Sequence, residues 1–314
     1  MPFFQSYVGP KSIKMLYLGH TGSGKTGSLV SLAAAGHRVR VLDLDNKAAI
    51  IQDYVTNPKS IYLKAREGLW TQEQANTISS RISYVTITEG YNILGAKAIP
   101  RGDSWHRINQ QLNDWRDGDD RPGNIGKWPA GDILVIDSFS RFCESALNFQ
   151  LSLNKRLDTG PQAGTGRGGG NDYSAAYKLI TDALQLLKSD DIKCHVILIC
   201  HIVFMDPDGP QVTANRSPKG YPQVFGRAMI SPVIGQYFSH SIRAISTGNA
   251  PSVRRTIVTT NDDNIELINP APLRLQEQYS LDTGLAEYFR DISEEVPKGT
   301  SSDPAVINFP GKGA

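Results

Sequence analysis

Short apolar runs alternate with longer segments of helical spacing along most of this chain. We expect buried strands where apolar residues dominate a short run: residues 13–18, 37–43, 133–138 and 195–200. A second kind of segment is rich in helix formers or spaces its apolar side chains by three and four: residues 27–35, 104–115, 142–149 and 172–187. Strands that alternate with helices predict a parallel α/β sheet with right-handed crossovers.

The remaining pattern is less regular. Residues 241–245 and 252–260 predict two strands joined by the turn-rich TGNAP, which indicates an antiparallel hairpin near the C-terminus. Residues 204–222 contain several proline and glycine residues and predict a loop, and residues 229–238 predict a short helix.

The expected domain organisation is simple. Residues 57–128 contain a predicted strand at 82–87, the helix 104–115 and a Gly/Pro-rich loop, and we treat them as an insertion. We therefore expect one domain over residues 1–295, followed by a solvated tail at residues 296–314.

The segment GHTGSGKT, residues 19–26, stands between the first strand and the first helix. Its glycines let the backbone turn and point N–H groups inward, and the helix dipole adds a positive end. Lys25 would reach the β- and γ-phosphates, and the hydroxyl of Thr26 would bind Mg²⁺. The segment predicts an ATP site formed by consecutive residues: Gly19, His20, Thr21, Gly22, Ser23, Gly24, Lys25, Thr26 and Gly27.

Three polar side chains follow other predicted strands. Ligands of a parallel sheet bind at the carboxyl ends of its strands, so Asp45, Asp137 and His201 are expected near the phosphates. Asp137 closes an apolar run and would hold Mg²⁺ with Thr26, directly or through water. Ser138 follows it where many motor ATPases have a Glu, so Asp45 becomes the candidate general base. His201 would sense the γ-phosphate at the start of a long loop.

The amino-acid composition excludes only a few classes of function. The chain has 33 basic and 31 acidic residues, a balance of +2, which neither requires nor excludes a nucleic-acid partner. No run approaches 18 apolar residues, and the N-terminus lacks a signal pattern, so we expect no membrane partner and a cytoplasmic location. The three cysteines lie in apolar segments without zinc spacing and indicate reduced core thiols.

The order of these motifs over residues 13–260 resembles the RecA-like P-loop ATPase core, most of all the short phage Sak-type single-strand annealing recombinases. The resemblance implies a RecA-like fold with a mostly parallel sheet flanked by helices, and catalytic roles for Lys25, Asp45, Asp137 and His201. It places Asp45 at the water-activating acid, where RecA has Glu, and His201 at the γ-phosphate sensor, where RecA has Gln. It also implies a homo-oligomeric ring or filament, with phage proteins acting in the host cytoplasm.

The resemblance further implies two DNA-binding loops, at residues 155–172 and 203–227. Each stretch carries three basic and two acidic residues, so each alone would bind single-stranded DNA weakly. Glycines would let backbone amides approach phosphates, and an aromatic ring could stack on bases. The residues expected to bind DNA are Lys155, Arg156, Arg167, Arg216, Lys219, Tyr221 and Arg227.

The function expected from these features is a DNA-stimulated ATPase of DNA recombination, in which ATP near a subunit boundary controls the DNA-binding loops. A single-strand DNA-binding protein is a further expected partner. The alternatives are a hexameric replicative helicase or helicase loader, and a nucleotide-binding module with structural ATP and no turnover. A small-molecule kinase is disfavoured, because residues 160–170 contain only one arginine. Arg254 and Arg255, on the expected hairpin, are candidates to complete the site of a neighbouring subunit.

Overall fold

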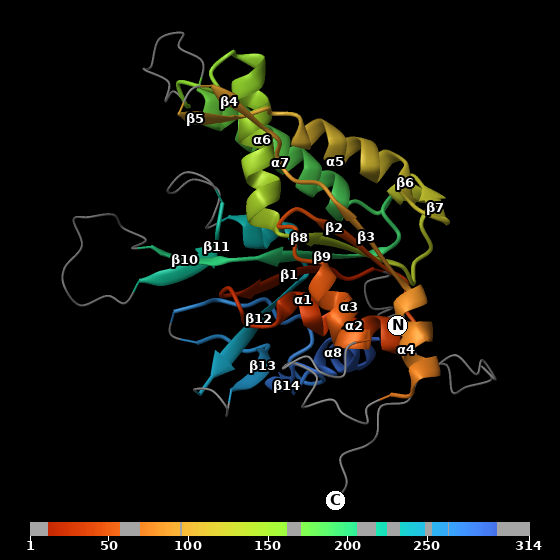
Figure 1. Cartoon of the computed structure of the whole chain (residues 1–314). Coiled ribbons are helices and arrows are strands. Elements are labelled where there is room, and N and C mark those ends of the chain that lie inside the picture. The colour runs from red at the N-terminus through yellow and green to blue at the C-terminus, as the bar shows by residue number, and fades with distance from the viewer. Residues whose placement is uncertain are drawn as a thin grey trace, which may run out of the picture.

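An eight-stranded sheet organises the molecule (Figure 1). The computed structural model describes residues 12–56, 70–94, 96–161, 171–205, 218–224, 233–248, 253–262 and 264–293. The strands of the sheet, in chain order, are β1 (Lys14–Gly19), β2 (Val39–Asp43), β3 (Ile82–Thr86), β8 (Ile133–Asp137), β9 (His195–Cys200), β12 (His240–Thr247), β13 (Arg254–Val258) and β14 (Gln278–Ser280).

The order across this sheet is β14-β13-β12-β1-β9-β8-β2-β3. The six strands from β12 to β3 run parallel, whereas β13 and β14 are antiparallel to their neighbours. The register aligns Asp43 with Asp137 on adjacent strands, and Leu18 with Cys200. The carboxyl ends of β1, β2, β8 and β9 therefore meet at one edge of the sheet.

Helices cover both faces of the sheet (Figure 1). On one face lie α1 (Lys25–Ser28), α2 (Val30–Ala34), α3 (Ala49–Thr56), α4 (Gln72–Ser80) and α8 (Gly284–Ile292). On the other face lie α5 (Ser104–Asn113), α6 (Phe139–Leu153) and α7 (Asp172–Lys188). Asn171 accepts a hydrogen bond from Ser174 N and caps α7, and Ser138 caps α6.

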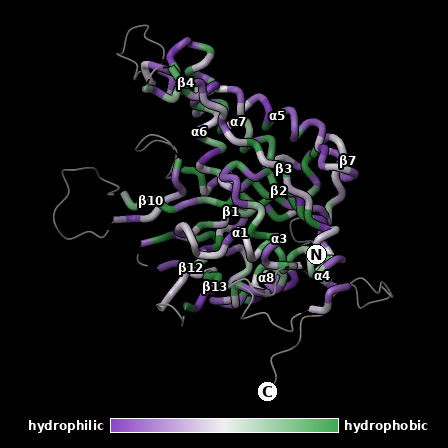
Figure 2. Tube along the Cα trace, in the orientation of Figure 1, coloured by the Kyte–Doolittle hydropathy of each residue, from purple (hydrophilic) through white to green (hydrophobic). Residues whose placement is uncertain are grey.

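Alternate residues of the central strands serve two separate cores. On β1, Met15 and Tyr17 pack with the α1–α4 and α8 side, whereas Leu16 and Leu18 pack with the α5–α7 side. Both sets are almost completely buried. Figure 2 shows green apolar positions along the central strands and many purple polar positions on the outer helices. Burial on both faces is why the central strands read as continuous apolar runs.

These features confirm the fold class expected from the sequence: α/β, a mostly parallel sheet flanked by helices, and an antiparallel C-terminal hairpin formed by β12 and β13. The strand expected at 82–87 is β3, at the end of the sheet beside β2. Gly36 has φ 107°, as a residue that ends a helix often does.

The predictions for two loops and for the end of one helix are wrong. The loop expected at 117–132 contains part of the hairpin β6 (Trp115–Asp117) and β7 (Asp120–Gly123), and the 3₁₀ turn Ile125–Lys127. The helix 104–115 ends at Asn113, because Trp115 pairs with Gly123 instead. The loop 204–222 is bounded by paired strands, β10 (Ile202–Met205) and β11 (Lys219–Pro222).

Further elements were not predicted from the sequence, although α8 has the apolar spacing of an amphipathic helix. They are the hairpin β4 (Tyr91–Leu94) and β5 (Lys97–Pro100), the short strand β14, and helix α8. The short helix expected at 229–238 is a 3₁₀ turn at Ile234–Tyr237 within the described residues. The expected tail at 296–314 lies outside the described residues.

Candidate nucleotide site

The glycine-rich loop joins β1 to α1, as the sequence predicts. Gly24 has φ 92° at the N-cap of α1, a left-handed conformation that side chains rarely adopt. A Cβ on Gly24 would also stand 2.4 Å from Leu281 Cδ2. The loop therefore requires glycine here, and it leaves the first backbone N–H groups of α1 without helical partners.

Lys25 lies inside this loop. Its Nζ donates to the carbonyl oxygens of Gly19 at 2.7 Å and His20 at 2.9 Å, and contacts Ser23 Oγ at 3.4 Å. The side chain is buried, and burial lowers the pKa of Lys25 to about 8. A phosphate among the loop N–H groups would find the ammonium within its reach and would favour the charged form.

A hydrogen bond joins Thr26, in the first turn of α1, to Asp137, the last residue of β8. Thr26 Oγ1 donates to Asp137 Oδ2 at 2.5 Å, across 111 residues of sequence. Asp137 is 4% exposed, and burial raises the pKa of its carboxyl to about 6 despite the Thr26 hydrogen bond. A hydroxyl and a buried carboxylate beside a phosphate loop are hard oxygen ligands, so the pair fits Mg²⁺. When bound with ATP, Mg²⁺ would neutralise phosphate charge here.

Asp43 organises the loop after β2. Its Oδ1 accepts from the backbone N–H groups of Asp45 and Lys47, and its Oδ2 accepts from Ala48 N at 2.9 Å and Thr86 Oγ1 at 3.2 Å. These four hydrogen bonds use both carboxylate oxygens of a buried side chain. Asp43 thereby fixes the position of Asp45, two residues further on.

Asp45 is surrounded by nitrogen groups of three side chains. Its carboxylate oxygens lie 3.2 Å from Lys47 Nζ, 3.3 Å from Arg141 Nε and 3.7 Å from His201 Nε2. Burial opposes ionisation, but hydrogen bonds with His201 and Lys47 outweigh it and hold the pKa of Asp45 well below its usual range. Burial is the main cause of the raised pKa of Asp137, and the negative charge of Asp45 adds to it.

His201 stands between β9 and β10, at the point where the chain leaves the sheet. Its ring contacts Asp45, and its carbonyl oxygen accepts from Gln223 N at 2.8 Å. His20, in the phosphate loop, stacks on Phe204 of β10 with ring centroids 5.9 Å apart. The β10–β11 hairpin thus contacts the phosphate loop, and His201, the residue directly before β10, contacts the candidate base.

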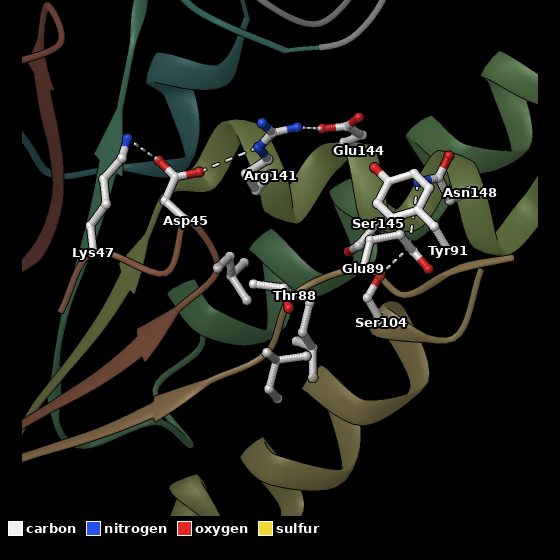
Figure 3. A pocket seen from close by; sticks show the side chains of 13 residues that line it. Asp45, Lys47, Thr88, Glu89, Tyr91, Ser104, Arg141, Glu144, Ser145 and Asn148 are labelled. Carbon is white, nitrogen blue, oxygen red and sulfur yellow. Dashed lines mark hydrogen bonds and ion pairs between the residues drawn. The ribbon is translucent and has the colours of Figure 1, made fainter. Parts of the chain in front are cut away.

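A cavity of about 250 Å³ borders Asp45 on the α5–α6 side (Figure 3). Its walls come from the residues after β2 and β3, from Tyr91 at the start of β4, and from α5 and α6. Arg141 and Glu144 stand on one side of it, and Glu89 on the other. Glu89 accepts from Gly102 N at 2.8 Å and Ser104 Oγ at 2.5 Å, so neutral donors orient it.

The sequence-predicted catalytic residues and phosphate-loop residues lie at this one edge of the sheet. Thr21 and Gly22 are exposed at the tip of the loop, Ser23 is buried beneath it, and Gly27 packs against the ring of Tyr54. The structure brings together the four side chains given catalytic roles from sequence: Lys25, Asp45, Asp137 and His201.

The residues expected to bind DNA differ in exposure and in their contacts. Lys155 is exposed after α6, whereas Arg156 donates to the buried carboxylate of Asp172 at 3.0 Å. Lys219, on β11, pairs with Glu266 at 2.5 Å, and Tyr221 is half-buried on the same strand. The other expected residues lie outside the described ranges: Arg167, Arg216 and Arg227.

Sequence reasoning missed Arg141, and it did not predict the contact that Arg255 makes within its own chain. Arg141 lies in the first turn of α6, four residues after Asp137, and this spacing alone does not predict its contact with Asp45. Arg255 contacts the phosphate loop of its own chain, with its Nε 3.4 Å from Gly22 O. The expectation that Arg255 acts on a neighbouring subunit stays a prediction, beside this contact within the chain.

Other site types find little support. Among the described residues, no three His, Cys, Asp or Glu side chains gather in a way that would hold a metal ion. The three cysteines are buried and unpaired, as expected. None of the helices in the described ranges is long and apolar enough to cross a membrane.

Comparison with known proteins finds many similar solved structures, two of which are described here. A KaiC-like protein from the archaeon Pyrococcus horikoshii shares 12% identity with a TM-score of 0.35, over 80% of this chain and 79% of that one. The flagellar accessory protein FlaH from Methanocaldococcus jannaschii shares 13% identity with a TM-score of 0.34, over 86% of this chain and 84% of that one. No protein-family model matches the chain, and no curated protein does.

Proposed function

We propose that this chain is an ATPase that binds single-stranded DNA and belongs to the recombinase or annealing class. The observation that carries the proposal is the hydrogen bond from Thr26 Oγ1 to Asp137 Oδ2. It joins the hydroxyl of a phosphate loop to a strand-end carboxylate, which is the arrangement that holds Mg²⁺ and triphosphate in phosphate-loop ATPases.

The chemistry follows from the neighbouring groups. Lys25 and the loop N–H groups would bind the phosphates, and Asp45 would orient a water molecule toward the γ-phosphorus. Attack by that water breaks the bond from the γ-phosphorus to the β–γ bridging oxygen, and ADP carries that oxygen away. The proton of the water passes to Asp45 or to phosphate.

The link to DNA rests on the β10–β11 hairpin. His201 touches Asp45, and Phe204 stacks on His20 of the phosphate loop. The expected second DNA-binding loop, residues 203–227, begins on this hairpin. A γ-phosphate that moves His201 or His20 would therefore move the base of that loop. We propose that ATP orders the loop for DNA and that assembly into a ring or filament places many weak loops along one strand.

The first test is the steady-state ATPase rate with and without single-stranded DNA, for the wild type and for Asp45→Asn and Lys25→Ala. We expect DNA to raise the wild-type rate, and both variants to lose turnover. Asp45→Asn should keep its affinity for ATP, because Asp45 is not part of the phosphate loop. A wild-type rate that DNA leaves unchanged would refute the DNA-dependent part of the proposal.

One observation favours a second function, a nucleotide-binding module without turnover. Asp45 is held by Lys47, Arg141 and His201, and a carboxylate whose pKa lies well below its usual range is a weak base. A protein that binds ATP but does not hydrolyse it, with or without DNA, would establish this alternative.

A further inference from the structure

Arg141 bridges two carboxylates beside the candidate site. Its Nε lies 3.3 Å from Asp45 Oδ1, and its Nη1 lies 2.5 Å from Glu144 Oε2. Asp45 follows β2, whereas Arg141 and Glu144 occupy the first turns of α6. The guanidinium is therefore shared between Asp45, which is proposed to act on water, and Glu144, for which the described residues show no contact with the phosphate loop.

The three groups differ in exposure. The side chain of Asp45 is 8% exposed, that of Arg141 56% and that of Glu144 42%. Asp45 is fixed by the loop that Asp43 organises, whereas Arg141 is a long side chain in contact with solvent. Exposed ion pairs are weak and screened, so the guanidinium is the part of this bridge that moves most easily.

The cavity of about 250 Å³ supplies room for such a movement. Arg141 and Glu144 both line it, and Figure 3 shows the guanidinium between Asp45 and Glu144 at its edge. A guanidinium that left Asp45 would keep its bond to Glu144 and would face the open side of the cavity. The charge of Arg141 stays paired in both positions, which keeps the cost of the movement low.

We propose that Arg141 is a positioning residue that acts as a latch on Asp45. When its guanidinium binds Asp45, it holds the carboxylate away from water. When the guanidinium binds Glu144 alone, Asp45 is released and can orient the attacking water. The proposal rests on the proposed function, which gives Asp45 its role. The remaining charged and titratable groups that face Asp45 stay in place in both positions: Lys47 and His201 on the same carboxylate, and Lys25, Asp43 and Asp137 nearby.

Two substitutions test the latch, because they act on it in opposite directions. Arg141→Gln removes the cation from Asp45, so we expect the ATPase rate without DNA to rise about threefold, the size of one exposed ion pair. Glu144→Gln removes the competing carboxylate and leaves Arg141 on Asp45, so we expect the rate to fall by a similar factor. Arg141→Lys keeps a charge on Asp45 and should stay near the wild type.

A matched control exists on the same face of the sheet. Lys178 and Asp182 form an exposed ion pair on α7, remote in sequence from the site. Lys178→Gln should change neither the rate nor the affinity for ATP. A purely structural role of the bridge would make Arg141→Gln and Glu144→Gln change the rate in the same direction, and that result would overturn the proposal.

A second readout needs no nucleotide. The titration of the Asp45 carboxyl, followed by carbon NMR in the free protein, should move to higher pH in Arg141→Gln and stay unchanged or move lower in Glu144→Gln. If Asp45→Asn abolishes turnover while both bridge variants behave as the wild type, the latch is refuted and the proposed function stands. If Asp45→Asn hydrolyses ATP at the wild-type rate, the catalytic role of Asp45 and the latch both fall, whereas the ATPase function itself stands.

Discussion

Replacement of Asp137 by asparagine should stabilise the nucleotide-free protein while it removes activity. Burial raises the pKa of this carboxyl from 3.8 to about 6, which corresponds to about 3 kcal/mol of destabilisation when the group is ionised. A raised pKa means that the folded state binds the proton more tightly, so stability is lost as pH rises from 3.8 through 6. The asparagine side chain would carry no charge, and its amide oxygen could still accept from Thr26.

The assay is urea unfolding of the wild type and of Asp137→Asn without nucleotide, at about pH 7.5 and pH 4. We expect the variant to be more stable by about 2–3 kcal/mol at the higher pH, and by less than about 1 kcal/mol at the lower pH. The difference between the proteins is the quantity to compare, because buried histidines titrate in the same range in both. A variant that is less stable at pH 7.5, or a difference that does not change with pH, would refute the reasoning.

Three further predictions concern binding, packing and pH. Lys25→Ala should weaken ATP binding about tenfold or more in calorimetry, since charge-assisted hydrogen bonds to phosphate are lost; unchanged affinity would place the nucleotide elsewhere. Leu134→Ala, in the centre of the sheet, should cost about 2–5 kcal/mol in urea unfolding, whereas Leu273→Ala, at a fully exposed side chain, should cost close to nothing; equal losses would contradict the core assignment. Burial lowers the pKa of His195 to about 3, so the stability contributed by the neutral ring is lost as pH falls below 6.5. The variant His195→Asn can still accept the hydrogen bond from Ile13 N, and its melting temperature should fall less between pH 7 and pH 5 than that of the wild type. An equal fall in both proteins would contradict this role of His195.

The sheet was predictable because its central strands are buried on both faces. β1, β8 and β9 read as apolar runs, and the helices between them carry strong periodicity. The edge elements were not predictable in the same way. The hairpin β4–β5 exposes Ile93 and Leu94, so its pattern carries no alternation between core and solvent. Trp115 looked helical by spacing, yet its pairing with Gly123 depends on tertiary contacts.

Within the candidate site, the polar residues at strand ends were predictable from the sequence, but the side-chain contacts between distant residues were not. Asp137 and Asp45 each follow an apolar run, and parallel topology brings such ends together. The bond from Arg141 to Asp45 spans 96 residues and depends on how α6 begins after Ser138, which spacing alone does not give. The same limit applies to Arg255, whose place beside Gly22 follows from the order of strands in the sheet.

The most direct test of the account measures DNA affinity in different nucleotide states. Anisotropy of a fluorescent single-stranded oligonucleotide would report binding to the full chain with a slowly hydrolysed ATP analogue and Mg²⁺, with ADP, and without nucleotide. The account predicts the tightest binding with the ATP analogue, and loss of that gain in Lys25→Ala. Equal affinity in all three states would contradict the claim that the phosphate loop controls a DNA-binding surface.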